Sequence, residues 1–259
     1  MKISYLESPE GLSHEGLLWE TLKAQIISQS PDVLVSNEMP FGSWLAATKS
    51  YDAESAQASV VANDKGIEEL RKLDIPIILS SRPVEAADKL ANEAFALVNG
   101  EYHFAHQKHY FPAERGFYES TWFSTDRQGF YVIKTARITI GFMLCTELMF
   151  NEWARAYKRQ GAHLIAVPRA SGQSYSSWKT AAAMAAIVSG CYVVSSNRVG
   201  KYDNALTFGG KGFAFAPDGS QISETTSANP VVSFELDFDW IARTQSDYPC
   251  YVEEIGRDT

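Results

Sequence analysis

The sequence predicts an α/β fold in which helices cover mixed β-sheets. Strand-like and helix-like patterns alternate along most of the 259 residues, which is typical of sheets packed against helices. Asn99-Gly100 separates two strand-like runs and is a strong signal for a β-hairpin, so antiparallel pairs are expected as well. Two such sheets facing each other would form a four-layer α-β-β-α sandwich. No linker, repeat or shift in composition divides the chain, so we expect one domain over residues 1–259.

The first half of the chain carries two helical patterns and five strand-like runs. Apolar residues at helical spacing predict a helix over Gly16–Ser28 and a longer helix over Ala53–Leu73. Short apolar or alternating runs predict strands over Lys2–Leu6, Val33–Ser36, Ile75–Ser80, Ala94–Val98 and Tyr102–Gln107.

The second half alternates in the same way. Phe130–Lys134 and Ile138–Phe142 are interpreted as paired strands. Helices are predicted over Glu147–Arg159 and Ser176–Ser189, and each ends near a glycine that leads into an apolar strand. The strands in question are Leu164–Val167 and Cys191–Ser196, and the remaining sequence predicts short strands, including Val231–Leu236, before a helical turn near Trp240.

Composition and charge exclude several classes of function. The formal charge is −8 at pH 7 and no run of lysines and arginines is present, so we expect neither a nucleic-acid partner nor binding to a membrane. Apolar runs such as Ile75–Leu79 are far shorter than the about 20 residues of a membrane-spanning helix. The N-terminus enters a strand without the apolar core of a signal peptide, and the cysteines are three in number. These features predict reduced thiols and a cytoplasmic location.

Cys145 lies where a strand-like run ends and an amphipathic helical pattern begins. A helix N-terminus offers backbone N–H donors and the positive end of the helix dipole. Such a site lowers the pKa of a thiol and can hold a developing oxyanion. A single cysteine is more often a small buried apolar residue, and Cys191 is interpreted in that way. The elbow position favours a nucleophilic role for Cys145.

Two further polar residues follow predicted strands. Glu38 comes after the apolar run that starts at Val33, and Lys108 follows the strand Tyr102–Gln107. Taken singly, each would more often be a solvated or ion-paired surface residue. Together with Cys145, they place a carboxylate, an ammonium and a thiol at the ends of three strands.

This order of residues resembles the nitrilase (carbon–nitrogen hydrolase) superfamily, in which a glutamate, a lysine and a cysteine follow one another along the chain. The segment after Cys145 is similar to that family in carrying an aromatic residue at +5, Phe150, and a glutamate at +7, Glu152. The segment Phe208–Gly219 resembles a late hairpin of the family, with Gly212 where a serine is common. The likeness covers about residues 35–236 and implies the nitrilase type of four-layer sandwich.

The resemblance and the residue types together imply a cysteine hydrolase. Glu38 would take the proton of the Cys145 thiol as the sulfur attacks an amide-type carbon. Lys108 and the backbone N–H of Thr146 would stabilise the tetrahedral oxyanion. Loss of ammonia or an amine would leave a thioester, which water activated by Glu38 would hydrolyse. This chemistry needs no metal or other cofactor, and none is expected.

Other residues are assigned to the same site by the resemblance or by position. A second glutamate follows the lysine in this family, and Glu119 is the better match, with Glu114 as the alternative. It would orient Lys108 or the leaving group. Arg169 follows a strand end and would either hold a substrate carboxylate or form an ion pair with a nearby acid. Trp178 is expected to line the same mouth.

The residues after the nucleophile indicate the substrate class. Nitrilases usually carry tryptophan directly after the cysteine, whereas this chain has Thr146-Glu147, which favours amides over nitriles. D-carbamoylase-like enzymes carry arginines shortly after the cysteine, where this chain has Leu148-Met149. We therefore expect hydrolysis of a small linear amide or an N-carbamoyl compound.

Three alternative functions stay open: nitrile hydrolysis by the same residues, acyl transfer to an amine, and a non-catalytic protein that keeps the fold for oligomerisation. Members of the family commonly form dimers or larger assemblies, so the resemblance implies a homo-oligomer.

His103, His106 and His109 do not predict a metal site, because on a strand His106 faces the side opposite to the other two.

Overall fold

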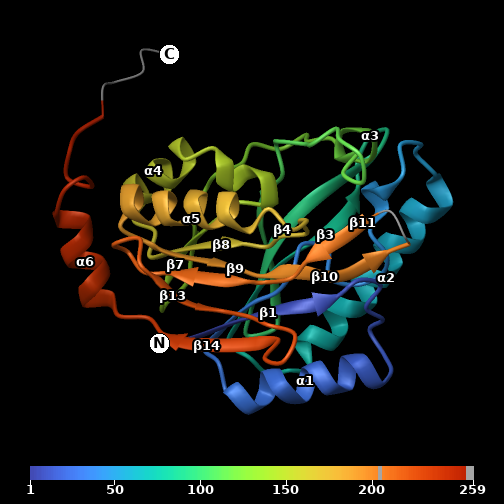
Figure 1. The fold of residues 1–259 in the computed structure, drawn as a ribbon, viewed down its shortest axis with the longest axis horizontal. Coiled ribbons are helices and arrows are strands. Elements are labelled where there is room, and N and C mark those ends of the chain that lie inside the picture. Colours follow the sequence, from blue (N-terminus) through green and yellow to red (C-terminus); the bar gives the residue numbers. More distant parts are fainter. Residues whose placement is uncertain (204–205, 255–259) are drawn as a thin grey trace.

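Two mixed β-sheets lie face to face at the centre of the computed structural model, which describes residues 1–203 and 206–254 (Figure 1). The larger sheet has the order β11-β10-β1-β2-β3-β4-β5, with β14 also paired to β1. Its strands are β1 (Lys2–Pro9), β2 (Val33–Val35), β3 (Ile77–Glu85), β4 (Leu90–Val98), β5 (Glu101–Gln107), β10 (Asn197–Tyr202), β11 (Leu206–Gly209) and β14 (Val231–Glu235).

The smaller sheet has the order β13-β12-β9-β8-β7-β6. Its strands are β6 (Ile133–Lys134), β7 (Thr139–Phe142), β8 (Leu164–Val167), β9 (Tyr192–Ser195), β12 (Phe213–Phe215) and β13 (Gln221–Glu224). The central strands β7, β8 and β9 are parallel, as are β1, β2 and β3 in the larger sheet. Parallel strands of this kind are buried on both faces, which explains their continuous apolar runs.

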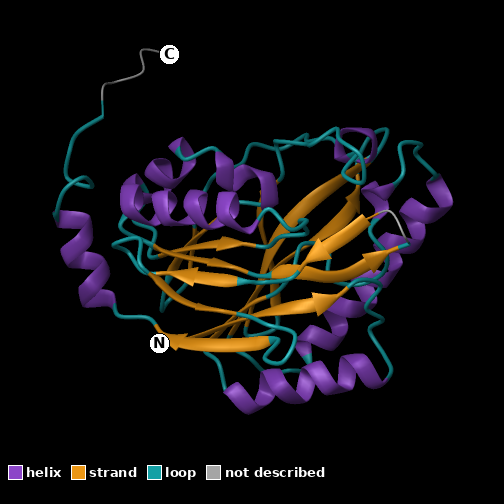
Figure 2. Cartoon of the chain, viewed as in Figure 1, coloured by secondary structure: helices purple, strands orange, loops and turns teal. Residues whose placement is uncertain are grey.

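Helices cover the outer face of each sheet (Figure 2). The helices are α1 (Leu17–Gln29), α2 (Ala53–Arg71), α3 (Glu119–Trp122), α4 (Glu152–Arg159), α5 (Tyr175–Ser189) and α6 (Phe238–Ser246), with short 3₁₀ helices η1 (Leu45–Ala47) and η2 (Cys145–Met149). Along the described chain, none of them combines the length and apolar character needed to cross a lipid bilayer.

Three apolar clusters define the layers. One joins inward residues of both sheets, such as Ile3 and Leu79 of the larger sheet and Ile140 and Val194 of the smaller. A second packs α1 and α2 against the larger sheet. A third packs α4 and α5 against the smaller sheet. The four-layer α-β-β-α sandwich predicted from the sequence is confirmed.

Most predicted elements are present, with shifted ends. The hairpin at Asn99-Gly100 joins β4 to β5 as an antiparallel pair. The predicted strand Phe130–Lys134 is wrong in extent, because only Ile133–Lys134 pairs with β7. The predicted helix Glu147–Arg159 is divided into η2 and α4, so the chain turns between Cys145 and α4.

The glycine-rich segment Phe208–Gly219 crosses from one sheet to the other. Its first residues belong to β11, which pairs with β10, whereas β12 pairs with β9 and β13. The late hairpin therefore consists of β12 and β13. Gly212 lies at the crossing, where an added Cβ would be 2.8 Å from the carbonyl oxygen of Ser195. A serine at this position would need the backbone to move.

Gly141 lies in β7 directly beneath the ring of Tyr157, and an alanine there is expected to destabilise the protein. Its Cβ would be 2.5 Å from Cγ of Tyr157, whose hydroxyl donates to the carbonyl oxygen of Phe142 and fixes the ring. Gly141→Ala should lower the free energy of unfolding by about 1–3 kcal/mol, measured by urea denaturation. Gly172→Ala is the control, since its Cβ would be 3.7 Å from the nearest atom, an ordinary contact. Equal effects of the two substitutions would contradict this packing.

Candidate active site

Three ionisable side chains meet beyond the carboxyl-terminal ends of β2 and β5 in the larger sheet. Glu38 lies just beyond β2, Lys108 directly follows β5, and Glu119 begins α3. The Lys108 ammonium is 2.8 Å from Oε1 of Glu38 and 2.5 Å from Oε2 of Glu119. All three side chains are fully buried. Glu114 is exposed, so the structure places Glu119, and not Glu114, against the lysine.

Asn92 of β4 ties two of these residues together and was not recognised from the sequence. Its side chain donates to Oε1 of Glu38 at 2.8 Å, and its carbonyl oxygen accepts the N–H of Lys108 at 2.9 Å. Oε2 of Glu38 is buried and has no partner among the described residues. Since Oε1 already accepts from two donors, Oε2 is the oxygen available to take a proton.

The buried charges shift one another's pKa values. Burial opposes the charge of Lys108, but the carboxylates of Glu119 and Glu38 outweigh it, and the pKa of Lys108 is raised. Burial, assisted by the negative charge of Glu38 and opposed by Lys108, raises the pKa of Glu119 to about 8. Near neutral pH, Glu119 is therefore protonated more often than a solvent-exposed carboxyl.

Cys145 is the first residue of η2 and lies at a sharp turn after β7. Its φ is 49°, a left-handed conformation that is unfavourable for a residue with a Cβ. The turn is held by the N–H of Cys145, which donates to the carbonyl oxygen of Pro168 at 3.0 Å. The sulfur lies 3.8 Å from the carbonyl oxygen of Ala170 and is almost fully buried. The elbow predicted from the sequence is present.

The expected lowering of the thiol pKa is wrong. Burial, and after it the negative charge of Glu38, raises the pKa of Cys145, and Lys108 only partly offsets this. Cys145 is also the first residue of a five-residue 3₁₀ helix and not of an α-helix, so only a small helix dipole acts on the thiol. Cys145 rests as a thiol and needs a base to become a nucleophile.

Thr146 presents a backbone N–H beside the thiol. Within residues 1–203 and 206–254, this N–H has no backbone acceptor, whereas the next N–H, of Glu147, donates to Leu144. Thr146 also lines an open hollow of about 460 Å³. The other residues of the hollow are Phe150 and the segment 109–114. The hollow therefore lies beside the residue that follows Cys145, whereas Cys145 itself does not line it.

Arg169 and Trp178, which were predicted to bind substrate, lie next to each other. The Arg169 guanidinium lies 5.1 Å from the centre of the Trp178 ring and is fully buried. It donates to the hydroxyls of Ser195 and Ser171 and to the carbonyl oxygen of Lys211. Burial lowers the pKa of Arg169 to about 10. In the described part of the chain it forms no ion pair, and its contact with a substrate carboxylate stays a prediction.

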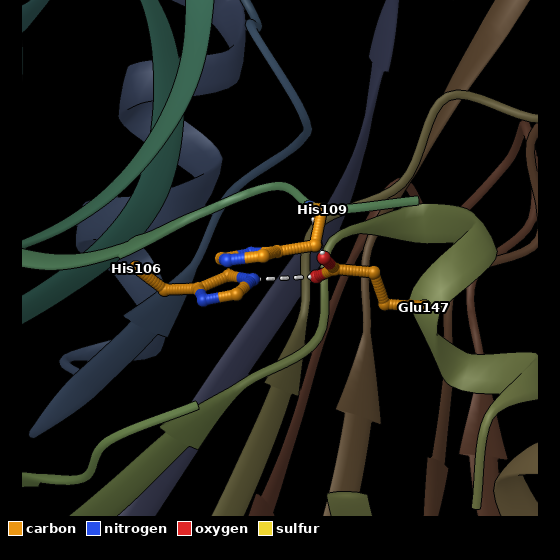
Figure 3. A group of neighbouring side chains, drawn as sticks. All are labelled: His106, His109 and Glu147. Carbon is orange, nitrogen blue, oxygen red and sulfur yellow. Dashed lines mark hydrogen bonds and ion pairs between the residues drawn. The ribbon is translucent and has the colours of Figure 1, made fainter. Parts of the chain in front are cut away.

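Two of the three histidines do come together, contrary to the sequence-based argument (Figure 3). Strand β5 ends at Gln107, so His109 is no longer bound by strand alternation, and its ring stacks on His106 with centroids 5.3 Å apart. Glu147 completes a group whose ligating atoms lie within 4.8 Å of one another. Nδ1 of His106 accepts the N–H of Phe130, and Nε2 pairs with Glu147. Hydrogen bonds within the protein therefore occupy both ring nitrogens of His106.

Sequence comparisons identify relatives among amidases. The profile described as "Carbon-nitrogen hydrolase" matches residues 23–245. An N-carbamoylputrescine amidase of Oryza sativa subsp. japonica is 29% identical over 156 residues, which are 54% of this chain and 52% of the rice protein. A (R)-stereoselective amidase of Pseudomonas sp. is 25% identical over 183 residues, 70% of this chain and 65% of that protein. The match spans about half the length of the plant relatives.

Solved structures share the fold over nearly the whole chain. A carbon–nitrogen hydrolase of Helicobacter pylori G27 superposes with a TM-score of 0.84 at 19% identity, covering 96% of this chain and 94% of that chain. An amidase of Nesterenkonia sp. superposes with a TM-score of 0.76 at 20% identity, covering 93% and 92%. These likenesses agree with the sandwich described above. Since the family profile matches most of its length, this chain belongs to the carbon–nitrogen hydrolase family.

Proposed function

We propose that this protein hydrolyses the C–N bond of a small linear amide or N-carbamoyl compound through a thioester on Cys145. The observation that carries the proposal is a fully buried cluster in which the Lys108 ammonium lies 2.8 Å from Glu38 and 2.5 Å from Glu119. Glu38 and Lys108 shift the pKa of the Cys145 thiol in opposite directions. Burying an ammonium and two carboxyls away from solvent costs free energy. A non-catalytic protein would not be expected to keep such a cluster. Perturbed groups of this kind concentrate at catalytic sites.

The first half of the reaction forms the thioester. Oε2 of Glu38, which has no partner among the described residues, takes the thiol proton as the sulfur of Cys145 attacks the carbonyl carbon. The carbonyl oxygen becomes an oxyanion, stabilised by the Lys108 ammonium and the N–H of Thr146. Glu38 then returns the proton to the nitrogen, the C–N bond breaks, and ammonia or an amine leaves.

The second half restores the enzyme. Glu38 takes a proton from water, and the resulting hydroxide attacks the thioester carbon. The tetrahedral intermediate collapses to the acid product, or to a carbamic acid from a carbamoyl substrate, and the Cys145 sulfur regains its proton from Glu38. Lys108 keeps its charge throughout, because its pKa is raised. The elbow at Cys145 holds the sulfur in place across both steps.

The substrate class rests on the relatives and on the size of the hollow. The plant relatives act on N-carbamoylputrescine by name, and a structure of the Nesterenkonia amidase contains butyramide. Another holds acrylamide added to its active-site cysteine. A hollow of about 460 Å³ beside Thr146 accommodates molecules of this size. Thr146 in place of tryptophan supports amides over nitriles.

Glu119 gives the reaction a pH dependence that can be measured. Burial raises the pKa of Glu119 to about 8, so above pH 8 it loses its proton and adds a negative charge beside Lys108. That charge disfavours both the thiolate and the oxyanion, so kcat/KM is expected to fall above pH 8. In Glu119→Gln, a neutral side chain of similar shape, this fall should disappear. A fall of the same size and midpoint in the variant would contradict this role.

We also infer a cytoplasmic location and a homo-oligomeric assembly. All three cysteines, Cys145, Cys191 and Cys250, are free and buried, which supports a compartment that keeps thiols reduced. The oligomer rests on the family resemblance alone. Its mass in solution, measured by light scattering, tests it, and a monomer at micromolar concentration would contradict it.

Ammonia release from a panel of amides, N-carbamoyl compounds and nitriles tests the function, with Cys145→Ala as the control. We expect release from at least one amide or carbamoyl compound and none from the variant. Release from nitriles alone would contradict the substrate class. Adding hydroxylamine identifies acyl transfer through formation of a hydroxamate. No activity on the panel, together with an unreactive Cys145, would favour the non-catalytic alternative.

A further inference from the structure

Glu147 is a buried carboxylate with three donors around it. Its Oε1 accepts the backbone N–H of His109 at 2.7 Å. Its Oε2 accepts the backbone N–H of Leu144 at 2.7 Å and lies 2.7 Å from Nε2 of His106 (Figure 3). The Glu147 and His106 side chains are inaccessible to solvent. None of the steps above uses this group.

The two backbone donors belong to the neighbours of catalytic residues. Leu144 directly precedes Cys145, and His109 directly follows Lys108. One carboxylate therefore joins two segments that lie in different sheets, the turn after β7 and the turn after β5. Charge-assisted hydrogen bonds of this kind are among the stronger contacts in proteins.

His106 fixes the carboxylate in its orientation. Nδ1 of His106 accepts the N–H of Phe130 at 3.1 Å, so in the neutral ring the proton is on Nε2 and is donated to Glu147. The ring also packs on Phe130, with centroids 4.6 Å apart. Because these bonds use the ring nitrogens and both carboxylate oxygens, the geometry favours a hydrogen-bonded clamp over a metal site.

We propose that Glu147 is a positioning residue that sets the separation of Cys145 and Lys108, with His106 orienting it. The inference rests on the proposed function, since it assigns the geometry of that same site. Cys145 has an unfavourable φ of 49°, and such a conformation persists only where surrounding contacts hold it. The bond from Leu144 to Glu147 is one of these contacts. A displacement of about 1 Å in a catalytic group costs about 100-fold in rate.

Glu147→Gln tests the clamp, because it keeps the size of the side chain and presents an N–H₂ group where one oxygen accepted a bond. We expect kcat to fall about 100-fold and KM to change less than about threefold, since Glu147 is not among the residues that line the hollow. His106→Gln retains one donor and one acceptor, and should preserve more activity than His106→Ala. Glu7→Gln is the matched control. Glu7 is also a buried carboxylate, and it accepts hydrogen bonds from the backbone N–H of Lys211 and the hydroxyl of Thr225.

Alkylation by iodoacetamide separates failure of this inference from failure of the proposed function. The rate at Cys145, relative to Cys191 and measured by peptide mass spectrometry, needs no substrate. We expect Glu147→Gln to lower that rate about tenfold, because the thiol loses its alignment with Glu38. This result would stand even if no amide were hydrolysed. A Glu147→Gln variant that loses melting temperature as Glu7→Gln does, with alkylation unchanged or faster and kcat per folded molecule unchanged, would overturn the proposal.

Discussion

Cys145→Ala is expected to abolish turnover while leaving the fold intact. In the proposed mechanism the sulfur is the atom that forms the thioester. The raised pKa of Lys108 keeps its amine protonated, so it is not available as a second nucleophile. We expect kcat/KM to fall by at least about 10⁴-fold, as is usual when a covalent nucleophile is removed. The melting temperature should change by only a few degrees, because one small buried atom is lost. Ammonia release and thermal unfolding measure the two effects.

Cys191→Ala provides the matched control. Cys191 is equally buried, and its sulfur lies 3.1 Å from the carbonyl oxygen of Ala162 on the helix-covered side of the smaller sheet. Its removal should cost stability through the cavity and leave kcat within about threefold. Activity above about 1% in Cys145→Ala, or loss of activity in both variants, would contradict the assignment of the nucleophile.

Glu38→Gln is expected to reduce kcat/KM by about 10³-fold, within the range for loss of a general base. Burial raises the pKa of Cys145, so without a base almost no thiolate forms near neutral pH. The amide oxygen of glutamine can still accept bonds from Lys108 and Asn92, which limits the structural effect. Steady-state kinetics with the amide substrate measure the fall in kcat/KM.

Glu93→Gln is the control for this substitution. Glu93 follows Asn92 in β4, and successive side chains of a strand point to opposite faces. Glu93 is buried but pairs with the hydroxyl of Tyr102, away from Lys108. Its variant should keep kcat/KM within about threefold. If Glu38→Gln retained more than a tenth of the wild-type activity, another group would have to act as the base.

The sequence predicts the architecture well where one physical signal dominates. Asn99-Gly100 provides the positive φ values that a tight hairpin needs, and β4 and β5 pair across it. Leu164–Val167 is apolar throughout because β8 is covered on both faces, and its bounds were predicted correctly. Glu38 and Lys108 each follow a strand of the larger sheet, and strand ends at one edge of a sheet bring such residues together. Cys145 follows a strand of the smaller sheet.

The bounds of a strand are predicted less well where the strand contains buried polar residues. Strand β4 begins at Leu90, four residues before the predicted start. The prediction started too late because Asn92 and Glu93 interrupt the apolar pattern of the strand. Both are buried, and Asn92 donates to Glu38. Strand β3 likewise continues to Glu85, past buried serines at 80 and 81. A buried polar residue breaks the periodicity that identifies a strand.

Glu147 and His106 show the same difficulty in three dimensions. The sequence contains both residues, but it does not predict that they contact each other. Their contact depends on where β5 ends and on the 3₁₀ turn at η2. Strand alternation, extended past Gln107, places His109 on the wrong side. Neither the end of a strand nor the break between η2 and α4 has a signal in the apolar pattern, because tertiary hydrogen bonds determine both.

Mass spectrometry of the acyl-enzyme tests the role of Cys145 most directly. The protein is mixed with an activated ester of the acyl group found in its best amide substrate, quenched in acid and digested. Fast acylation by the ester makes thioester hydrolysis the slow step, so the acyl group should accumulate. We predict its mass on the peptide that contains Cys145, and an unmodified peptide in Cys145→Ala. Ester turnover with the acyl group on another residue, or with Cys145 never modified, would contradict the thioester mechanism.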